Sequence, residues 1–141
     1  MAFGYQLLVD MYDCEGEAIS SISISYEFLE RLAELLKMTK QSPPFLFRSD
    51  GKAFPDKAGL SGWLPLIESG IQIHTLERDR FVSLDVYSCK QFDTAVVLAY
   101  AREVFKPADM EHEFVHRGKK YRTPAKRTGE TDLLSFSGSQ T

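Results

Sequence analysis

Apolar and polar residues alternate along several stretches of this chain, and they follow a helical period along two others. Residues 4–12 alternate and place their bulky apolar side chains on one side, which is typical of a strand with one buried face. Leucine and phenylalanine then recur every three or four residues through 25–38, which predicts an amphipathic helix with Ser25 as its N-cap. Pro43 and Pro44 exclude a continuation of that helix.

The middle of the chain has the pattern of consecutive antiparallel strands. A short strand is expected from residue 45, before a turn-rich loop. Residues 62–67 predict another strand, which Pro65 would restrict to a sheet edge or a bulge. Two alternating segments, 70–76 and 81–89, follow and are separated only by four charged residues. This arrangement is typical of a β-hairpin whose charged tip faces solvent.

A second amphipathic helix is predicted over residues 92–105, with Asp93 or Thr94 as its cap and Pro107 as its stop. A last strand follows at 110–116. Strands outnumber helices, and each helix has a single apolar stripe. These features predict an α+β fold, a two-layer sandwich in which a mostly antiparallel sheet carries both helices on one face.

The predicted sheet leaves its second face without helices. A second copy of the chain is the expected cover, so we expect a homodimer. Residues 1–118 are expected to form this single domain. Residues 119–141 are polar and aperiodic, and we expect them to be a flexible tail.

The composition is that of an ordinary soluble domain, since 43% of the 141 residues are hydrophobic and 26% are charged. A net charge of −3 gives no basic surface for nucleic acid or an anionic membrane, so neither partner is expected. No apolar run is long enough to span a membrane and the first residues lack signal-peptide features, so we expect a cytoplasmic protein. The two cysteines form no CxxC motif, and His112 and His116 would lie about 13 Å apart, so no metal site is predicted.

The expected hairpin brings a thiol close to a turn. If residues 77–80 form its tip, the register runs back until Cys89 faces Glu68, beside the peptide bond between Glu68 and Ser69. Glu-Ser-Gly is ordinary turn chemistry, and this is one interpretation of the segment. The other is that the hydroxyl of Ser69 reacts with the backbone.

His74 lies on the same predicted strand, roughly 16 Å beyond Ser69 if the strand is ideal. A contact between the imidazole and the hydroxyl therefore needs a bend near Gly70, or one of the two groups must come from a partner subunit. The alternative is a half-buried strand histidine that bonds to Asp85 or Ser83.

Several stretches of the chain resemble motifs of the prokaryotic S-adenosylmethionine decarboxylases, small pyruvoyl enzymes of spermidine and polyamine biosynthesis. The spacings from Ser69 to Ser61, to His74 and to Cys89 agree with that family without a gap. The resemblance extends to about residue 118. The similar stretches are GYQLLVDMYDC, GLSGWLPLIESGIQIHT and LDVYSC, which correspond to the family's opening strand, its G-V-S-G, E-S-H and I-H-T motifs, and its V-D-V-F-T-C.

The resemblance implies a decarboxylase that is made as a zymogen and cleaves itself. Ser69 would attack the carbonyl of Glu68, with His74 as the base of the elimination that follows and Ser61 holding the intermediate. Autocatalytic cleavage would leave a covalent pyruvoyl cofactor, derived from Ser69, that forms a Schiff base with the small-molecule substrate. Cys89 would then be the proton donor in decarboxylation.

The resemblance also implies substrate-binding residues and two departures. Asp10 matches an acid on the first strand, and Phe54 is the match for an aromatic residue that stacks on adenine. Gly70 replaces a histidine, and Arg78 replaces a glutamate that binds the ribose hydroxyls. An arginine cannot accept those hydrogen bonds, so Glu77 is the candidate to substitute for that glutamate.

These departures leave alternatives open. The resemblance favours S-adenosylmethionine as the substrate. Another amino acid, such as arginine or ornithine, would suit a changed ribose site. A third possibility is an uncleaved, non-catalytic homologue that binds a ligand or an active paralogue.

Overall fold

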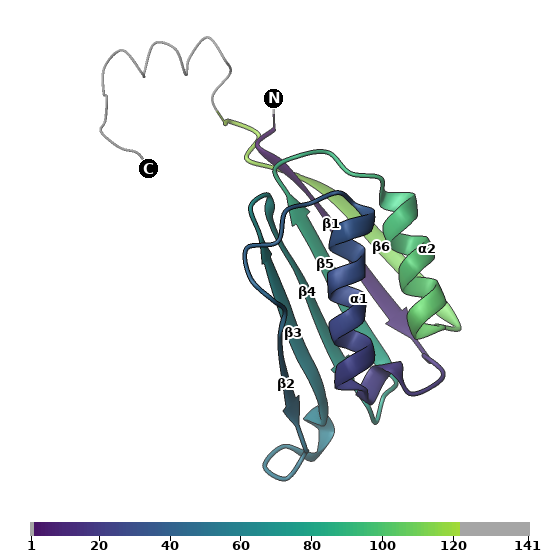
Figure 1. Cartoon of the computed structure of the whole chain (residues 1–141). Helices are drawn as coiled ribbons and strands as arrows, with labels where there is room; N and C mark the ends of the chain where they lie inside the picture. Colours follow the sequence, from purple (N-terminus) through teal and green to yellow (C-terminus); the bar gives the residue numbers. More distant parts are fainter. Residues whose placement is uncertain (1, 122–141) are drawn as a thin grey trace, which may run out of the picture.

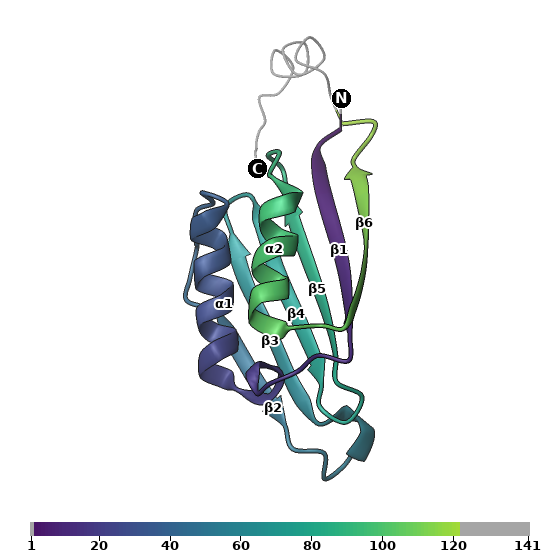
Figure 2. The same ribbon diagram turned by 90° about the vertical axis from the view of Figure 1, so that its right-hand side faces the viewer.

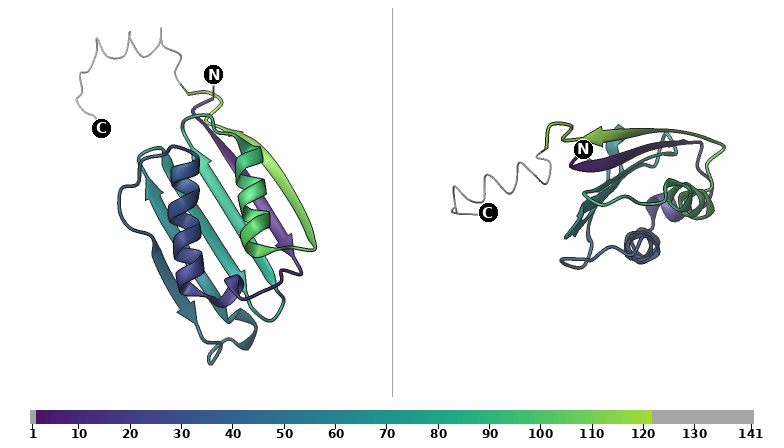
Figure 3. Two further views of the ribbon diagram at one scale, coloured as in Figure 1. Left: turned by 45° about the vertical axis from the view of Figure 1, so that its right-hand side comes forward. Right: turned by 90° about the horizontal axis from the view of Figure 1, so that it is seen from above.

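The computed structural model describes residues 2–121 and places two helices on one face of a six-stranded sheet (Figure 1). Neighbouring strands are all antiparallel, in the order β2-β3-β4-β5-β1-β6. Figure 2 and Figure 3 show both helices on the same side of the sheet, which confirms the predicted α+β two-layer sandwich. The elements are β1 (Gly4–Tyr12), η1 (Ala18–Ser20), α1 (Ile22–Leu35), β2 (Phe45–Ser49), η2 (Pro55–Lys57), β3 (Gly59–Leu66), β4 (Ser69–Leu76), β5 (Phe81–Ser88), α2 (Thr94–Phe105) and β6 (Asp109–Arg117).

The first helix begins earlier than its sequence pattern indicates. The hydroxyl of Ser21 accepts the N–H of Ile24 at 3.2 Å, so Ser21 is the N-cap of α1. The predicted cap, Ser25, is wrong, because its buried hydroxyl lies inside the helix and donates to the carbonyl of Ala18. Three serines alternate with isoleucines at this point of the sequence and hide the true start.

The second helix agrees with its prediction at both ends. The carboxylate of Asp93 caps α2 by accepting the N–H of Ala95 at 2.9 Å. Lys106 then takes a left-handed conformation with φ of 48°, and Pro107 follows. Neither α1 nor α2 is long and apolar enough to cross a membrane, and residues 2–121 hold no other helix that could do so. Residues 122–141 of the expected tail lie outside the described residues.

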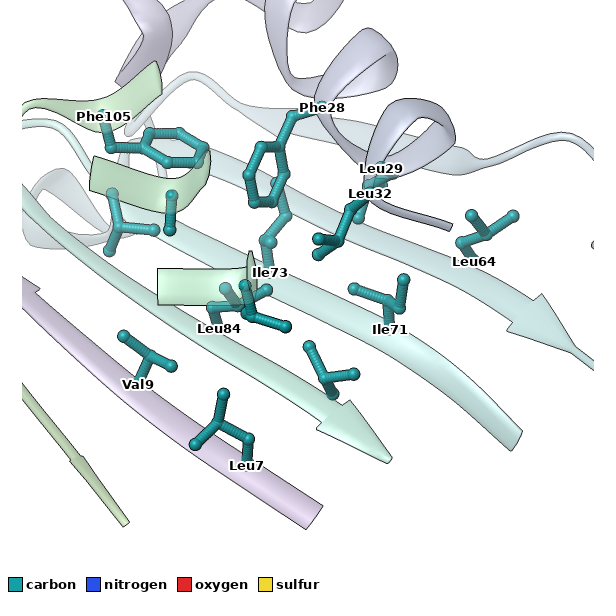
Figure 4. Packing of buried hydrophobic residues seen from close by; sticks show 14 of the residues in the cluster. Leu7, Val9, Phe28, Leu29, Leu32, Leu64, Ile71, Ile73, Leu84 and Phe105 are labelled. Carbon is teal, nitrogen blue, oxygen red and sulfur yellow. The ribbon is translucent and has the colours of Figure 1, made fainter. Parts of the chain in front are cut away.

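The core lies between the helices and the sheet (Figure 4). At its centre Phe28 stacks on Tyr100, with ring centroids 5.1 Å apart, and meets Phe105 edge-on at 5.0 Å. Every second strand residue points into this layer, and the next one points to the opposite side. The sheet contributes side chains that are at most 1% exposed, among them Leu7, Val9, Leu64, Ile71, Ile73 and Leu84.

The opposite side of the sheet, here called the open face, has no helix over it among residues 2–121 (Figures 2 and 3). It carries three exposed aromatic side chains, since Phe45 is 45% exposed, Phe47 69% and Trp63 51%. Exposed aromatic side chains gathered on one face favour a surface for a ligand or a partner. The residues predicted to be chemically active lie along this face or at its edge.

Pro65 lies on an interior strand, so the prediction of an edge or a bulge is wrong. β3 runs between β2 and β4, but its pairing with β2 ends at Trp63. Beyond that point the outer side of β3 faces residues 39–41, and Gln41 donates its N–H to the Pro65 carbonyl. The nitrogen and the carbonyl of one strand residue point the same way, so Pro65 removes no hydrogen bond to β4.

Candidate active site

The hairpin of β4 and β5 has the register that the sequence predicts. Leu76 pairs with Phe81 at its tip, and Gln72 pairs with Asp85. At the other end of the hairpin Cys89 follows the last paired residues, Ser69 and Ser88. The charged tip therefore lies at one end of the open face and the candidate cleavage site at the other.

The peptide bond between Glu68 and Ser69 is held from two sides. The backbone N–H of Cys89 donates to the carbonyl oxygen of Glu68 at 2.8 Å. On the other side the carboxylate of Glu68 accepts the N–H of Thr39 at 3.0 Å. A donor aimed at a carbonyl oxygen also stabilises the negative charge that a nucleophilic attack would create there. The structure thus brings Cys89 and Glu68 together, at the one carbonyl that Ser69 would attack.

Ser69 has an unusual backbone torsion. Two residues, Ile67 and Glu68, connect β3 to β4, and neither has a positive φ. Two-residue hairpin turns normally take positive φ within the turn, where it matches the strand twist. Here the next residue takes it, since Ser69 has φ of 147°, whereas the other described non-glycine residues with positive φ lie between 48° and 57°. Such a conformation costs about 1–3 kcal/mol, so strain is stored at the candidate nucleophile.

Ser61 and His74 form a hydrogen-bonded pair on the open face. They are direct partners across β3 and β4, and their Oγ and Nδ1 atoms are 3.1 Å apart. This is the hydrogen bond of His74, in place of the expected alternative with Asp85 or Ser83. Because Ser61 holds the ring through Nδ1, Nε2 is left for proton transfer.

His74 and Ser69 remain separated on one straight strand. Gly70 pairs with Pro65 on one side and Tyr87 on the other, so β4 continues through it without a bulge. The bend near Gly70 that would join the imidazole to the hydroxyl is therefore absent from this structure. Within one chain, therefore, the structure does not bring the imidazole of His74 to the hydroxyl of Ser69.

Two hollows lie side by side on the open face. The first, of about 370 Å³, is here called the polar hollow and adjoins Ser69. The second, of about 320 Å³, is here called the aromatic hollow and adjoins Ser61. The polar hollow is lined by Gln6, Trp63, Ser69, Gly70, Ile71, Gln72, Asp85 and Tyr87, and the aromatic hollow by Phe45, Phe47, Ser61, Gly62, Trp63 and Gln72.

Asp85 contributes a carboxyl group to the polar hollow. Burial raises the pKa of its carboxyl group, and the negative charge of Asp10 raises it further. Asp10 lies on β1, where it pairs with Ser83 of β5 and Glu111 of β6. The predicted site residue Asp10 and the hairpin residue Asp85 thus lie close together on the open face.

The other predicted substrate-binding residues lie elsewhere. Phe54 is 66% exposed in the loop between β2 and β3 and lines neither hollow. The carboxylate of Glu77 binds the guanidinium of Arg48 at 2.8 Å, and Arg48 also contacts the Ser20 carbonyl in the helix layer. Glu77 is therefore turned away from the open face. Arg78 lies exposed at the hairpin tip, 3.9 Å from Asp79.

Sequence reasoning missed the aromatic residues of the site. Phe45, Phe47 and Trp63 were assigned to strands, but no role was predicted for them. The signal was available in the alternation, because Trp63 lies two residues from Ser61 and so shares its face. Within residues 2–121 no group of three or more histidine, cysteine or acidic side chains is placed to hold a metal ion.

Known proteins resemble this chain over most of its length. The family described as S-adenosylmethionine decarboxylase matches residues 5–118. An S-adenosylmethionine decarboxylase proenzyme from Clostridium botulinum (strain Loch Maree / Type A3) is 33% identical over 119 residues, which cover 82% of this chain and 95% of that protein. The proenzyme from Thermoplasma acidophilum is 30% identical over 116 residues, covering 82% and 83%.

A solved structure has the same fold. The adenosylmethionine decarboxylase from Aquifex aeolicus VF5 superposes with a TM-score of 0.69, covering 83% of this chain and 92% of that one, at 23% identity. The family match spans nearly all of the described residues and includes the candidate cleavage site. This chain therefore belongs to the S-adenosylmethionine decarboxylase family.

Proposed function

We propose that this chain is a self-processing, pyruvoyl-dependent decarboxylase that acts on S-adenosylmethionine in polyamine biosynthesis. The observation that carries the proposal is the hydrogen bond from the Cys89 N–H to the carbonyl of Glu68, next to the strained backbone of Ser69. A donor at that oxygen and a hydroxyl on the following residue are what an attack on the backbone requires.

The first step would be an acyl shift. Oγ of Ser69 attacks the carbonyl carbon of Glu68, the C–N bond breaks, and an ester replaces the amide while the amine of residue 69 is freed. During the attack the carbonyl oxygen becomes negative, and the N–H of Cys89 stabilises it. The same step relieves the backbone strain at Ser69, because it breaks the amide bond between Glu68 and Ser69 that defines the φ angle of Ser69.

The second step would be an elimination. A base removes the α-proton of residue 69, and Glu68 leaves as a carboxylate. Hydrolysis of the resulting dehydroalanine releases ammonia and leaves a pyruvoyl group at residue 69. We assign the base to His74, because Ser61 fixes its ring through Nδ1 and leaves Nε2 to take the proton.

The pyruvoyl ketone would supply an electron sink for the loss of CO2 from a bound amino acid. The exposed thiol of Cys89, beside residue 69, would then donate a proton to the carbon that lost CO2. This role needs a reduced thiol. We therefore infer a cytoplasmic location, since that compartment keeps cysteines reduced.

We further propose that two chains pair through their open faces. Ser69 and His74 lie on one straight strand, so a single chain does not join them. A twofold axis that passes between the two positions brings Ser69 of one protomer to His74 of its partner. The same pairing covers the exposed aromatic residues of the open face.

A second substrate class has a specific observation in its favour. Glu77 is bound to Arg48 and Arg78 lies at the exposed hairpin tip, so no acid stands where the family resemblance places a ribose-binding glutamate. Asp85 and Asp10 would suit the cationic side chain of a smaller amino acid. Arginine or ornithine is therefore the second candidate substrate.

The deciding experiment is an intact mass measurement of the purified chain and of Ser69→Ala. We expect the unaltered chain to give fragments 1–68 and 69–141, the second without a free amine, and Ser69→Ala to stay whole. Release of labelled CO2 from S-adenosylmethionine, arginine and ornithine then identifies the substrate. An uncleaved chain that releases no CO2 would favour a binding role in its place, and CO2 release by Ser69→Ala would exclude the pyruvoyl mechanism.

A further inference from the structure

Trp63 is the single tryptophan of the chain, and it stands at the boundary between the two hollows. It lies on β3, where it pairs with Phe45 of β2 and Gln72 of β4. Its ring stacks on that of Phe45, with centroids 5.9 Å apart, and about half of its surface is exposed on the open face. The indole is thus a wall shared by the polar and the aromatic hollow.

Gly70 gives the indole this position. A glycine inside a strand is destabilising, so its presence needs a local reason. A Cβ atom on residue 70 would lie 3.1 Å from Nε1 of Trp63 and 3.3 Å from the carbonyl oxygen of Leu64. The second neighbour is backbone and cannot move aside. A Cβ on residue 70 would therefore require the indole to shift by a few tenths of an ångström, so the two positions are coupled.

The coupled pair lies next to the reacting residue. By covalent geometry, Nε1 of Trp63 is within about 7 Å of the carbonyl carbon of residue 69. The nitrogen of the indole lies against residue 70, since it is 3.1 Å from the position that a Cβ there would take. Nothing in the proposed processing steps uses the indole.

We propose that Trp63 is a specificity-determining residue, and that it holds the substrate against residue 69. This inference rests on the proposed decarboxylase function. The indole closes one side of the polar hollow, so the amino-acid end of the substrate is confined between Trp63 and the polar residues opposite, and the rest of the substrate is directed past the ring. Removal of the ring merges the two hollows and loosens that selection.

Binding is tested without turnover, in the uncleaved Ser69→Ala chain. Because Trp63 is the only tryptophan, its fluorescence reports directly on this wall. The probes are S-adenosylmethionine, arginine and ornithine, with excitation at the red edge of indole absorption, where adenine does not absorb. We expect a saturable change with the amino acid that the processed enzyme decarboxylates. A processed enzyme that turns over while Ser69→Ala shows no change with any probe overturns the proposal for Trp63 and leaves the decarboxylase function standing.

Substitutions test selectivity. In Trp63→Ala chains that have cleaved themselves, we expect a KM about 10-fold higher, a kcat within about 3-fold, and discrimination among the three amino acids reduced about 10-fold. Gly70→Ser should give the same changes by displacing the indole. The double variant should be no worse than Trp63→Ala alone, because both act through one ring. Independent, additive effects of the two substitutions would overturn the coupling.

Controls keep the result interpretable. Phe114→Ala removes an exposed ring from the helix side of β6 and should leave KM unchanged. Trp63→Phe keeps a ring against Phe45 and serves if Trp63→Ala fails to fold. We expect it to retain most of the discrimination. Normal KM and normal discrimination in Trp63→Ala, or in Gly70→Ser if Trp63→Ala fails to fold, would exclude a selective role for the indole.

Discussion

Ser61 and His74 face each other across β3 and β4, with 3.1 Å between Oγ and Nδ1. The pair fixes the imidazole on the open face at one end of β4, whereas Ser69 lies at the other end of the same strand. A strand cannot fold back on itself over this length, so the two predicted partners of the elimination reaction are held apart within one chain. This separation makes the proposed dimer testable through chemistry.

We expect Ser69 of one chain to be processed with His74 of the other. Ser69→Ala and His74→Ala chains, each whole when expressed alone, should complement each other when co-expressed with different tags. If pairing is random, about half of the His74→Ala chains lie in mixed dimers and should be cleaved. Intact mass of each tagged chain measures this fraction.

The Ser69→Ala chains in the same mixture are the internal control and should all remain whole. Failure of the His74→Ala chains to cleave, in a sample shown to contain mixed dimers, would mean that the base does not come from the partner.

Cys89→Ala should separate the two proposed roles of residue 89. Its backbone N–H is unchanged, so the hydrogen bond to Glu68 remains and self-cleavage should continue. The proton donor is lost, so decarboxylation should fall about 100-fold or more. Intact mass follows the first effect and labelled CO2 the second. Turnover at the normal rate would remove the thiol from the mechanism.

The two cysteines should differ in their reaction with iodoacetamide. Cys89 is exposed, whereas burial raises the pKa of the Cys14 thiol to about 11, only partly offset by Arg80. We expect one adduct, at Cys89, on the folded Ser69→Ala chain at neutral pH, and two after unfolding in guanidinium. Peptide mass mapping locates each adduct. Rapid labelling of Cys14 in the folded chain would contradict its buried position.

Asp85→Asn should stabilise the fold at neutral pH. Burial and the charge of Asp10 raise the pKa of Asp85 above its ordinary value of 3.8, so the folded state holds this proton more tightly than the unfolded state. The contribution of Asp85 to the free energy of unfolding is present below its pKa in the unfolded state. It is lost as the pH rises through its raised pKa in the folded state. At pH values above the raised pKa, Asp85→Asn lacks the buried charge, so its melting temperature should be a few degrees higher than that of its parent.

Thermal denaturation across a pH series, in the Ser69→Ala background, checks this expectation. The difference between Asp85→Asn and its parent should shrink as the pH falls. Asp79→Asn, at the exposed hairpin tip, is the matched control and should show no such trend. An equal effect of Asp85→Asn at every pH would rule out the charge as the cause.

Local signals were predictable from the sequence. The hairpin register followed from the charges of its tip, and α2 followed from Asp93 and Pro107. The contact between Cys89 and Glu68 followed from that register, because the register of an antiparallel pair fixes which residues lie opposite each other. The pairing of Ser61 with His74 was not predicted, although the short turn between β3 and β4 fixes which residues face each other.

Side-chain directions and backbone torsions, which depend on the three-dimensional structure rather than on sequence spacing, were not predictable. The contact of Trp63 with Gly70 arises because an indole from one strand covers a position on the next, and residue types alone do not give side-chain direction. The orientation of Glu77 toward the helix layer depends on its salt bridge to Arg48, and the sequence does not indicate this pairing. The positive φ of Ser69 could not be predicted either, because the sequence indicates a positive φ mainly where the residue is glycine.

The torsion of Ser69 gives the proposed maturation a direction. A φ angle exists only while a residue carries an amide on its N-terminal side, and the proposed cleavage discards that nitrogen as ammonia. The α-carbon also becomes planar, so the mature end has neither the chirality nor the bond that made the conformation costly. Rejoining the two fragments would have to rebuild both the chiral α-carbon and the bond to nitrogen. We therefore expect processing to be irreversible, so that each molecule is cleaved once.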